Sequence, residues 1–182
     1  MNRHVLSVLV ENQSGVLSRV AGLFSRRGYN IDSLSVGETE DPKISRMTIV
    51  VRCDDQILDQ IKKQVKKLVN VLTVVELDPE RSVFRELALI KVKTSLTTRA
   101  SVMEVVEIFR ANTVDVATDS LTVAMTGDEA KINAFVELMK PYGIVEIVRA
   151  GLTAIERGTQ ALKNYEQSEK SEEESGNGED VL

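Results

Sequence analysis

The residues best suited to chemistry lie in a short turn at residues 12–17, with the sequence Asn-Gln-Ser-Gly-Val-Leu. The turn joins a predicted strand to a predicted helix start, where unpaired backbone N–H groups and the helix dipole favour a carboxylate. Gly15 leaves this backbone open, Asn12 can donate or accept a hydrogen bond, and the two residues after Gly15 offer an apolar wall. The turn could therefore receive an α-amino acid with a hydrocarbon side chain. The alternative is an ordinary turn in which Ser14 or Asn12 caps the helix.

The common catalytic constellations are missing from the sequence. It contains no serine elbow, no paired-glycine dinucleotide fingerprint, no phosphate loop and no His-x-x-x-His. The carboxylates of Asp54 and Asp55 lie at a predicted helix start, so we expect a charged surface there. The single histidine, His4, is also expected at the surface, and the single cysteine, Cys53, is expected to pack as a small residue. We therefore predict no catalytic residue and no metal site.

Composition restricts partners and location. Residues 164–182 hold seven acidic residues and one lysine, a net charge of −6 against −5 for the whole chain, and are expected to be disordered. The rest of the chain is nearly neutral and only 4% of residues are aromatic, so we expect no nucleic-acid binding. No apolar run approaches the ~20 residues that cross a bilayer, and no signal sequence precedes the first strand. We expect a cytoplasmic location and no membrane contact.

The order of predicted elements occurs twice. Each half reads as strand, helix, strand, strand, helix, strand, from β-branched runs and from apolar residues at helical spacing. In the first half the strands are 5–10, 31–36, 47–51 and 71–77, and the helices are 17–24 and 54–68. In the second half the strands are 87–92, 114–117, 121–125 and 144–148, and the helices are 102–109 and 128–139.

This repeat predicts an α+β fold of two tandem ferredoxin-like βαββαβ domains. We place the first domain at residues 1–78, a linker at 79–85, the second domain at 86–160 and the acidic tail at 161–182. Both alternations of the first strand are apolar, although helices cover only one face of such a sheet. Something should cover the other face or extend the sheet edge, so we predict at least a homodimer.

The turn and the residues after it resemble a known family. Residues 12–24, followed by Arg-Arg-Gly-Tyr-Asn-Ile-Asp-Ser-Leu at 26–34, closely resemble the ACT domain of acetohydroxyacid synthase (acetolactate synthase) small subunits. Ser14 and Ala150 depart from the Pro and Thr common in relatives, but neither supplies a polar group proposed for the ligand. The resemblance covers residues 3–160, with further motifs similar to the second domain of the family at residues 46–50, 85–92, 108–111, 120–122, 126–128, 149–152 and 157–158.

The resemblance implies a non-catalytic regulatory subunit whose ACT domains pair side by side in a homodimer and bind valine between them. One protomer would contribute the turn and its partner the segment at 30–31. The matching effector-binding positions in this sequence are Asn12, Gly15, Val16, Leu17, Asn30 and Ile31.

A partner is implied as well, the catalytic (large) subunit of acetolactate synthase. That subunit would hold thiamine diphosphate, magnesium and FAD and condense pyruvate with a second 2-keto acid. The chain would activate it and confer feedback inhibition by valine in branched-chain amino acid biosynthesis. One methylene changes discrimination by only about 1–3 kcal/mol, so isoleucine and leucine are expected to act weakly too.

Other classes of function stay open on the residues alone. A free-standing ACT-type sensor, acting through another protein, would share the first module but would not need the motifs of the second. An RNA-binding ferredoxin-like module should carry exposed aromatic and basic residues on its central strands, and residues 31–36 and 47–51 do not. A small ferredoxin-like enzyme would need an acid, base or nucleophile cluster that is missing here.

Overall fold

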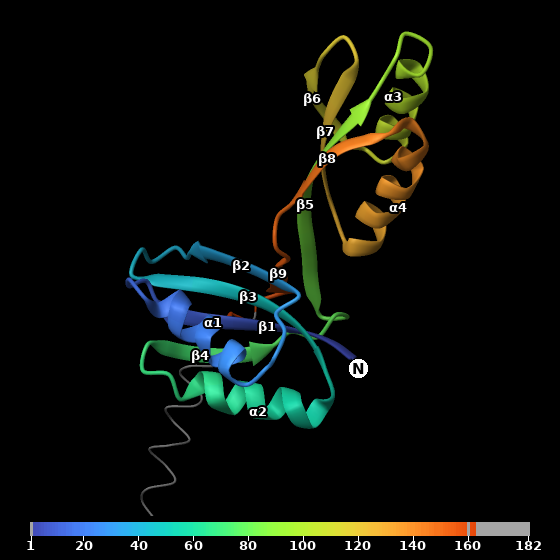
Figure 1. The fold of residues 1–182 in the computed structure, drawn as a ribbon. Helices are drawn as coiled ribbons and strands as arrows, with labels where there is room; N and C mark the ends of the chain where they lie inside the picture. Colours follow the sequence, from blue (N-terminus) through green and yellow to red (C-terminus); the bar gives the residue numbers. More distant parts are fainter. Residues whose placement is uncertain (1, 160, 163–182) are drawn as a thin grey trace, which may run out of the picture. The chain divides into compact units, whose positions relative to one another are not determined.

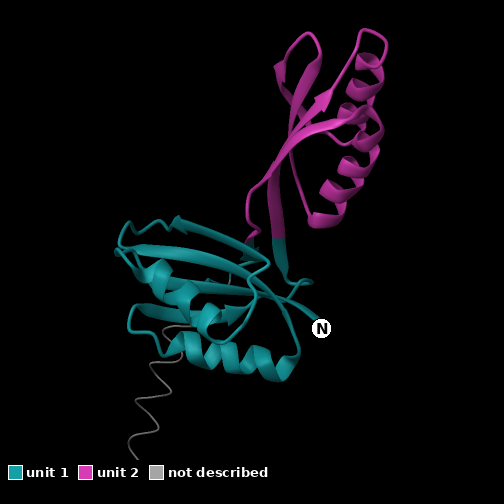
Figure 2. Cartoon of the chain, viewed as in Figure 1, with its two compact units in different colours: residues 1–83, 154–182 teal, residues 84–153 magenta. Residues whose placement is uncertain are grey.

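The computed structural model describes residues 2–159 and 161–162, which form two compact units (Figure 1). The first unit consists of residues 2–83 together with the described residues from Ala154 onward, and the second consists of residues 84–153 (Figure 2). From residue 163 on, the predicted acidic tail lies outside the described residues. The division differs from the predicted one because part of the expected linker forms a strand and because the chain after residue 153 belongs to the first unit.

A four-stranded antiparallel sheet, in the order β2-β3-β1-β4, forms the first unit with two helices. Its elements are β1 (Asn2–Glu11), α1 (Val16–Arg26), β2 (Ser33–Glu38), β3 (Ile44–Cys53), α2 (Asp55–Lys66) and β4 (Val71–Glu76). One face of the sheet, which includes Leu6, Val8 and Met47, packs with both helices in a single core. The predicted ferredoxin-like arrangement is confirmed, although β2 begins two residues later than the predicted strand.

Local sequence explains where these helices begin and end. The Asp54 carboxylate caps α2 by accepting a 2.9 Å hydrogen bond from the Ile57 N–H. Leu58, Ile61 and Val65 then fall at helical spacing and are buried. After α1, Gly28 adopts the left-handed conformation with φ of 69°, which glycine reaches without steric cost. Both helix boundaries were predicted from these residue types.

The second unit repeats the first, with its sheet in the order β6-β7-β5-β8. Its elements are β5 (Ser82–Lys93, which begins in the first unit), α3 (Arg99–Ile108), β6 (Asn112–Val116), β7 (Ser120–Gly127), α4 (Glu129–Met139), the short η1 (Lys140–Tyr142) and β8 (Ile144–Arg149). An irregularity is repeated too. The register shifts at Leu9/Val10 between β1 and β4, and at Lys91/Val92 between β5 and β8. The two halves are therefore the same fold in detail, as predicted.

The second face of the first sheet is closed by the chain itself. After the second unit, β9 (Thr153–Glu156), which the sequence did not predict, pairs with β5, and the Arg157 N–H donates a 2.8 Å hydrogen bond to the Arg81 carbonyl. We call residues 154–159 and 161–162 the return segment. Leu162 of this segment shares a cavity with Leu9, and Leu9 is buried. The exposed face on which the homodimer prediction partly rested is thus covered, so that argument for a homodimer fails.

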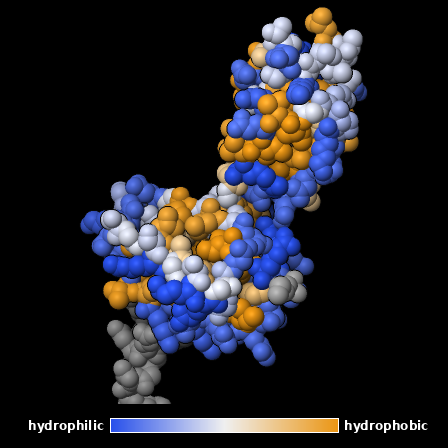
Figure 3. Space-filling model, in the orientation of Figure 1, coloured by the Kyte–Doolittle hydropathy of each residue, from blue (hydrophilic) through white to orange (hydrophobic). Residues whose placement is uncertain are grey.

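The equivalent face of the second unit is more open. Leu87 and Leu89 alternate with buried residues of β5, and 43% and 38% of their surfaces are exposed. Val148 of β8, paired with Leu89, is exposed as well. The space-filling view shows apolar side chains gathered on the visible side of this unit (Figure 3). The two repeats therefore share a fold but differ in what covers their sheets.

Candidate functional site

The 12–17 turn contains the residue at which α1 begins. Gly15 is the N-cap residue of α1 and is left-handed, with φ of 84°. In the described part of the chain, no atom other than those of its neighbours lies within 4 Å of where a Cβ would stand. No described side chain caps α1, so the alternative of a turn capped by Ser14 or Asn12 is wrong. The start of this helix is exposed and open to an anion.

Two other helices, α2 and α4, begin with an aspartate, whereas α1 begins with a glycine. The Asp54 carboxylate caps α2, and the Asp128 carboxylate caps α4 by accepting a 2.8 Å hydrogen bond from the Lys131 N–H. Each of these helices carries its own anion at its positive end. α1 carries a glycine at the same position, so an anion there would have to come from outside the helix.

Asn12 is directed toward the loop that follows β2. Its amide nitrogen donates to the Glu38 carboxylate at 3.1 Å and to the Pro42 carbonyl at 2.9 Å. Its backbone N–H donates to the Lys43 carbonyl at 2.7 Å. The Asn12 amide is thus held beside the Glu38 carboxylate, and the Asn12 side-chain oxygen and this carboxylate are two acceptors that a ligand ammonium could use. Glu38 was missed by sequence reasoning because only the fold brings it beside Asn12.

The two residues after Gly15 differ in their surroundings. Leu17 is 43% exposed and can form an apolar wall for a ligand. Val16 is buried in the core of the first unit, so its side chain cannot line the site as predicted. Only the Val16 backbone remains at the turn.

The remaining predicted residues lie at the far end of α1. The helix has 11 residues, so about 16 Å of helix separates the turn from the segment that holds Asn30 and Ile31. The Asn30 amide donates to the Asp32 carboxylate at 2.7 Å, and Ile31 packs against the core. A single protomer therefore does not bring the two halves of the predicted site together.

Two family models match almost the whole of the described chain. The AHAS small subunit-like ACT domain matches residues 6–73, and the small subunit of acetolactate synthase matches residues 85–158. The chain belongs to the acetolactate synthase small subunit family. A free-standing ACT sensor would not need the second module, so the match over residues 85–158 argues against that alternative.

Relatives and a solved structure agree with this family. Acetolactate synthase small subunits from Mycolicibacterium smegmatis and Mycobacterium bovis are 52% and 53% identical over 159 residues. These alignments cover 87% of this chain and 94% and 95% of the relatives. The crystal structure of the small subunit from Thermotoga maritima superposes with a TM-score of 0.82 at 41% identity, covering 88% of this chain and 100% of that one. The chain is thus similar to a regulatory subunit with an ACT domain, which implies a catalytic subunit as its partner.

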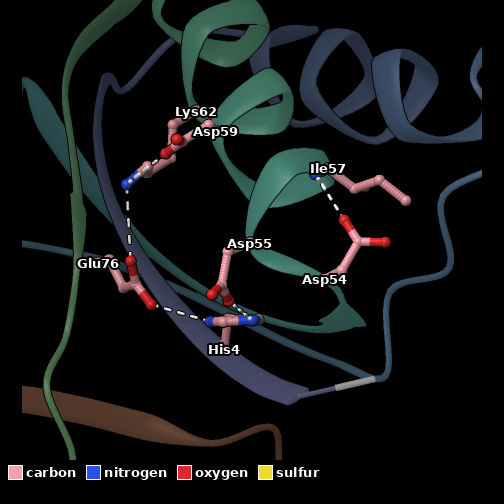
Figure 4. Close-up of polar contacts among 7 residues, drawn as sticks. All are labelled: His4, Asp54, Asp55, Ile57, Asp59, Lys62 and Glu76. Atoms are coloured by element: carbon pink, nitrogen blue, oxygen red, sulfur yellow. Dashed lines mark hydrogen bonds and ion pairs between the residues drawn. The ribbon is translucent and has the colours of Figure 1, made fainter.

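In this small subunit His4 is not a surface residue, which corrects the prediction. Its side chain is only 10% exposed, with Nδ1 2.9 Å from the Glu76 carboxylate and Nε2 3.6 Å from that of Asp55 (Figure 4). Lys62 of α2 reaches the other oxygen of Glu76 at 3.5 Å. The cluster joins β1, α2 and β4 through a hydrogen bond and ion pairs, so we interpret it as structural.

Cys53 of the small subunit is buried, as its predicted packing role requires. Burial raises the pKa of its thiol, and the carboxylates of Asp54, Asp55 and Glu76 raise it further. The protonated thiol is a poor nucleophile at neutral pH. Among the described residues, no group of three or more His, Cys, Asp or Glu side chains could hold a metal ion, and no helix is long and apolar enough to span a membrane.

Proposed function

We propose that this chain activates the catalytic subunit of acetolactate synthase and makes it subject to feedback inhibition by valine. The observation that supports the valine site best is the uncapped start of α1 at Gly15. A valine carboxylate there would accept the hydrogen bonds that Asp54 and Asp128 accept at the other helices. The ammonium would face Asn12 and Glu38, and the isopropyl group would lie against Leu17.

A homodimer is part of this proposal. Because α1 separates the turn from Asn30 and Ile31, a complete site needs the turn of one protomer and the 30–31 segment of another. A two-fold axis would create two such sites at once, since each protomer offers both halves. The strands β2 and β4 lie at the two ends of the first sheet and offer edges for this pairing.

Inhibition would then follow from linkage between the two subunits. Valine can shift the assembly only if it binds the active and inhibited arrangements with different affinities, and a coupling of about 1–3 kcal/mol is typical. Burying the valine side chain supplies roughly 1.5–3 kcal/mol, enough for such a difference. In this proposal thiamine diphosphate, magnesium and FAD belong to the catalytic subunit, which carries out the condensation.

Reconstitution tests the proposed function directly. The purified chain is mixed with an acetolactate synthase catalytic subunit, and acetolactate output is measured with and without valine. We expect output to rise when the chain is added and to fall again as valine is titrated. Output that does not change on adding the chain would contradict activation, and activated output insensitive to valine would contradict the sensing role.

The second unit is also proposed to take part in activation. Truncation after Glu80 would test this poorly, because it also removes the return segment that covers the first sheet. A sharper variant replaces residues 84–153 by a short glycine-serine turn and keeps the chain from Ala154. The 2.8 Å hydrogen bond between Arg157 and Arg81 shows that the two new ends lie close together. Full activation by this variant would show that the second unit is not required.

A further inference from the structure

A cavity suited to a small ligand lies within the first unit, on the sheet face away from the helices. Its volume is about 410 Å³. Leu9 and Arg46 form its floor, residues 39–41 form one side, and the return segment lines it with Ile155 and Leu162. Since a cavity of about 150 Å³ accepts benzene, this one has room for a molecule of eight or nine heavy atoms together with water.

Arg46 supplies a held guanidinium. Its Nε donates a 2.9 Å hydrogen bond to the Ser7 hydroxyl, which fixes the side chain against the sheet. Burial lowers the Arg46 pKa, while the nearby carboxylates of Glu156 and Glu40 act in the opposite direction. An arginine remains charged under such conditions, and its planar fork matches a carboxylate.

Carboxylates line this cavity beside the guanidinium. Among the described residues, Glu40, Asp41 and Glu156 line it together with Arg46, so groups of both charges face the cavity. Aliphatic side chains, Leu9 and Ile44 among them, form the rest of its lining. A simple anion can pair only with the guanidinium, whereas a zwitterion brings an ammonium for the carboxylates and a carboxylate for the guanidinium.

We propose that this cavity binds one α-amino acid with an aliphatic side chain in each protomer. The ligand carboxylate pairs with Arg46, its ammonium faces the carboxylates of the 39–41 loop and of Glu156, and its hydrocarbon part packs against the aliphatic lining. The lining residues come from one chain, so this site forms without a second copy and does not depend on the site proposed at Gly15.

The position of the cavity also links it to the turn. The loop at residues 39–43 lines the cavity on one side and is held by Asn12 on the other, through the carbonyls of Pro42 and Lys43. The loop is ordered internally, since the Asp41 carboxylate accepts a 2.9 Å hydrogen bond from the Lys43 N–H. A ligand in the cavity would therefore contact the same loop that positions Asn12. It would contact the return segment as well, and so connect that segment to the loop.

Isoleucine methyl signals allow the two sites to be followed separately in the full-length chain. Ile44 and Ile155 line the cavity, whereas Ile31 lies at the far end of α1 from the turn. The methyl-labelled protein is titrated with valine, with 2-oxoisovalerate, which lacks the ammonium, and with isobutylamine, which lacks the carboxylate. We expect valine to shift the methyl signals of Ile44 and Ile155 in the natural chain and also in the Gly15→Asp variant. These shifts should occur at a lower concentration of valine than of either analogue.

Two variants probe the cavity and one serves as a control. Arg46→Gln should weaken the titration of the cavity signals about 10- to 100-fold, the loss expected for a charge-assisted pair. Ile155→Phe, at a position 55% exposed, fills space without removing charge and should weaken it as well. Arg81→Gln changes an exposed arginine paired with Asp78 at 3.3 Å and should leave it unchanged.

The outcomes separate this proposal from the previous one. Valine-dependent shifts at Ile44 and Ile155 that disappear in both cavity variants support the cavity site, even if Ile31 does not respond and the site at the turn is refuted. Shifts confined to Ile31, or cavity shifts that are equally strong in Arg46→Gln and Ile155→Phe, overturn the cavity site. Equal potency of isobutylamine and valine overturns the role of Arg46.

Discussion

Replacing Gly15 by aspartate should remove valine binding at the turn while leaving the fold nearly intact. Aspartate in the left-handed conformation costs about 1 kcal/mol, since the general penalty of 1–2 kcal/mol is smallest for Asn and Asp. A carboxylate at the positive end of α1 returns about 0.3–1 kcal/mol through the helix dipole. The free energy of unfolding should therefore change by less than about 1 kcal/mol. The open space around Gly15 adds no clash to this balance.

The effect on valine binding should be far larger. Displacing the ligand carboxylate loses charge-assisted hydrogen bonds worth about 1.5–3 kcal/mol. Two carboxylates about 4 Å apart near a protein surface repel by a further 1–4 kcal/mol or so. Together these terms predict a loss of affinity of about 60-fold or more. Activation of the catalytic subunit should survive, because the change leaves the rest of the chain as it was.

Calorimetric titration with valine, urea unfolding and the acetolactate assay together test this reasoning. Gly15→Asn is the matched control, because it imposes the same backbone conformation and nearly the same shape without the charge. Its loss of valine affinity should be about tenfold smaller than that of Gly15→Asp, because it lacks the repulsion between the two carboxylates. Unchanged valine binding in the aspartate variant would refute the proposed site. Equal losses in both variants would refute the electrostatic part of the argument.

Three further predictions concern stability and reactivity. Leu162→Ala should lower the free energy of unfolding in urea by about 2–3 kcal/mol, the low end for a buried leucine beside an existing cavity, and no loss would show that the return segment is dispensable. Asp54→Ala should cost about 1 kcal/mol in the same assay through the lost cap of α2, whereas a neutral result would contradict its capping role. The raised pKa of Cys53 means that the unfolded thiol ionises first as pH rises, so stability should fall above the ordinary thiol pKa, and the fall should be smaller in Cys53→Ala. Rapid reaction of native Cys53 with a disulfide reagent at pH 7 would contradict its burial.

Much of the fold could be predicted because its signals are local. Leu58, Ile61 and Val65 share one side of a helix by spacing alone, and Asp54 marks where that helix begins. β9 escaped prediction because a four-residue strand has almost no periodicity and its partner strand lies about seventy residues earlier in the chain. The expected linker had the turn signals Asp78 and Pro79, but pairing of the residues after it extends β5 back to Ser82.

The candidate site was predictable only where the backbone itself is the functional group. The glycine between a strand and a helix identified Gly15, and the space beside its backbone is open, as expected. Glu38 and His4 depend on partners far along the chain, so residue type alone could not place them. Val16 was assigned to the wrong environment, because its place in the first turn of α1 leaves open which way its side chain points, and packing directs it into the core.

The return segment also sets an order of events during synthesis. The first sheet is complete in sequence once β4 has left the ribosome, yet the residues that cover its second face emerge only after about eighty more have been translated. At 5–20 residues per second, that face stays uncovered on the nascent chain for about 4–16 s. A gene fragment that ends after the first βαββαβ repeat would leave it uncovered permanently, so the two repeats cannot be separated by a simple cut and still give an aggregation-resistant N-terminal piece.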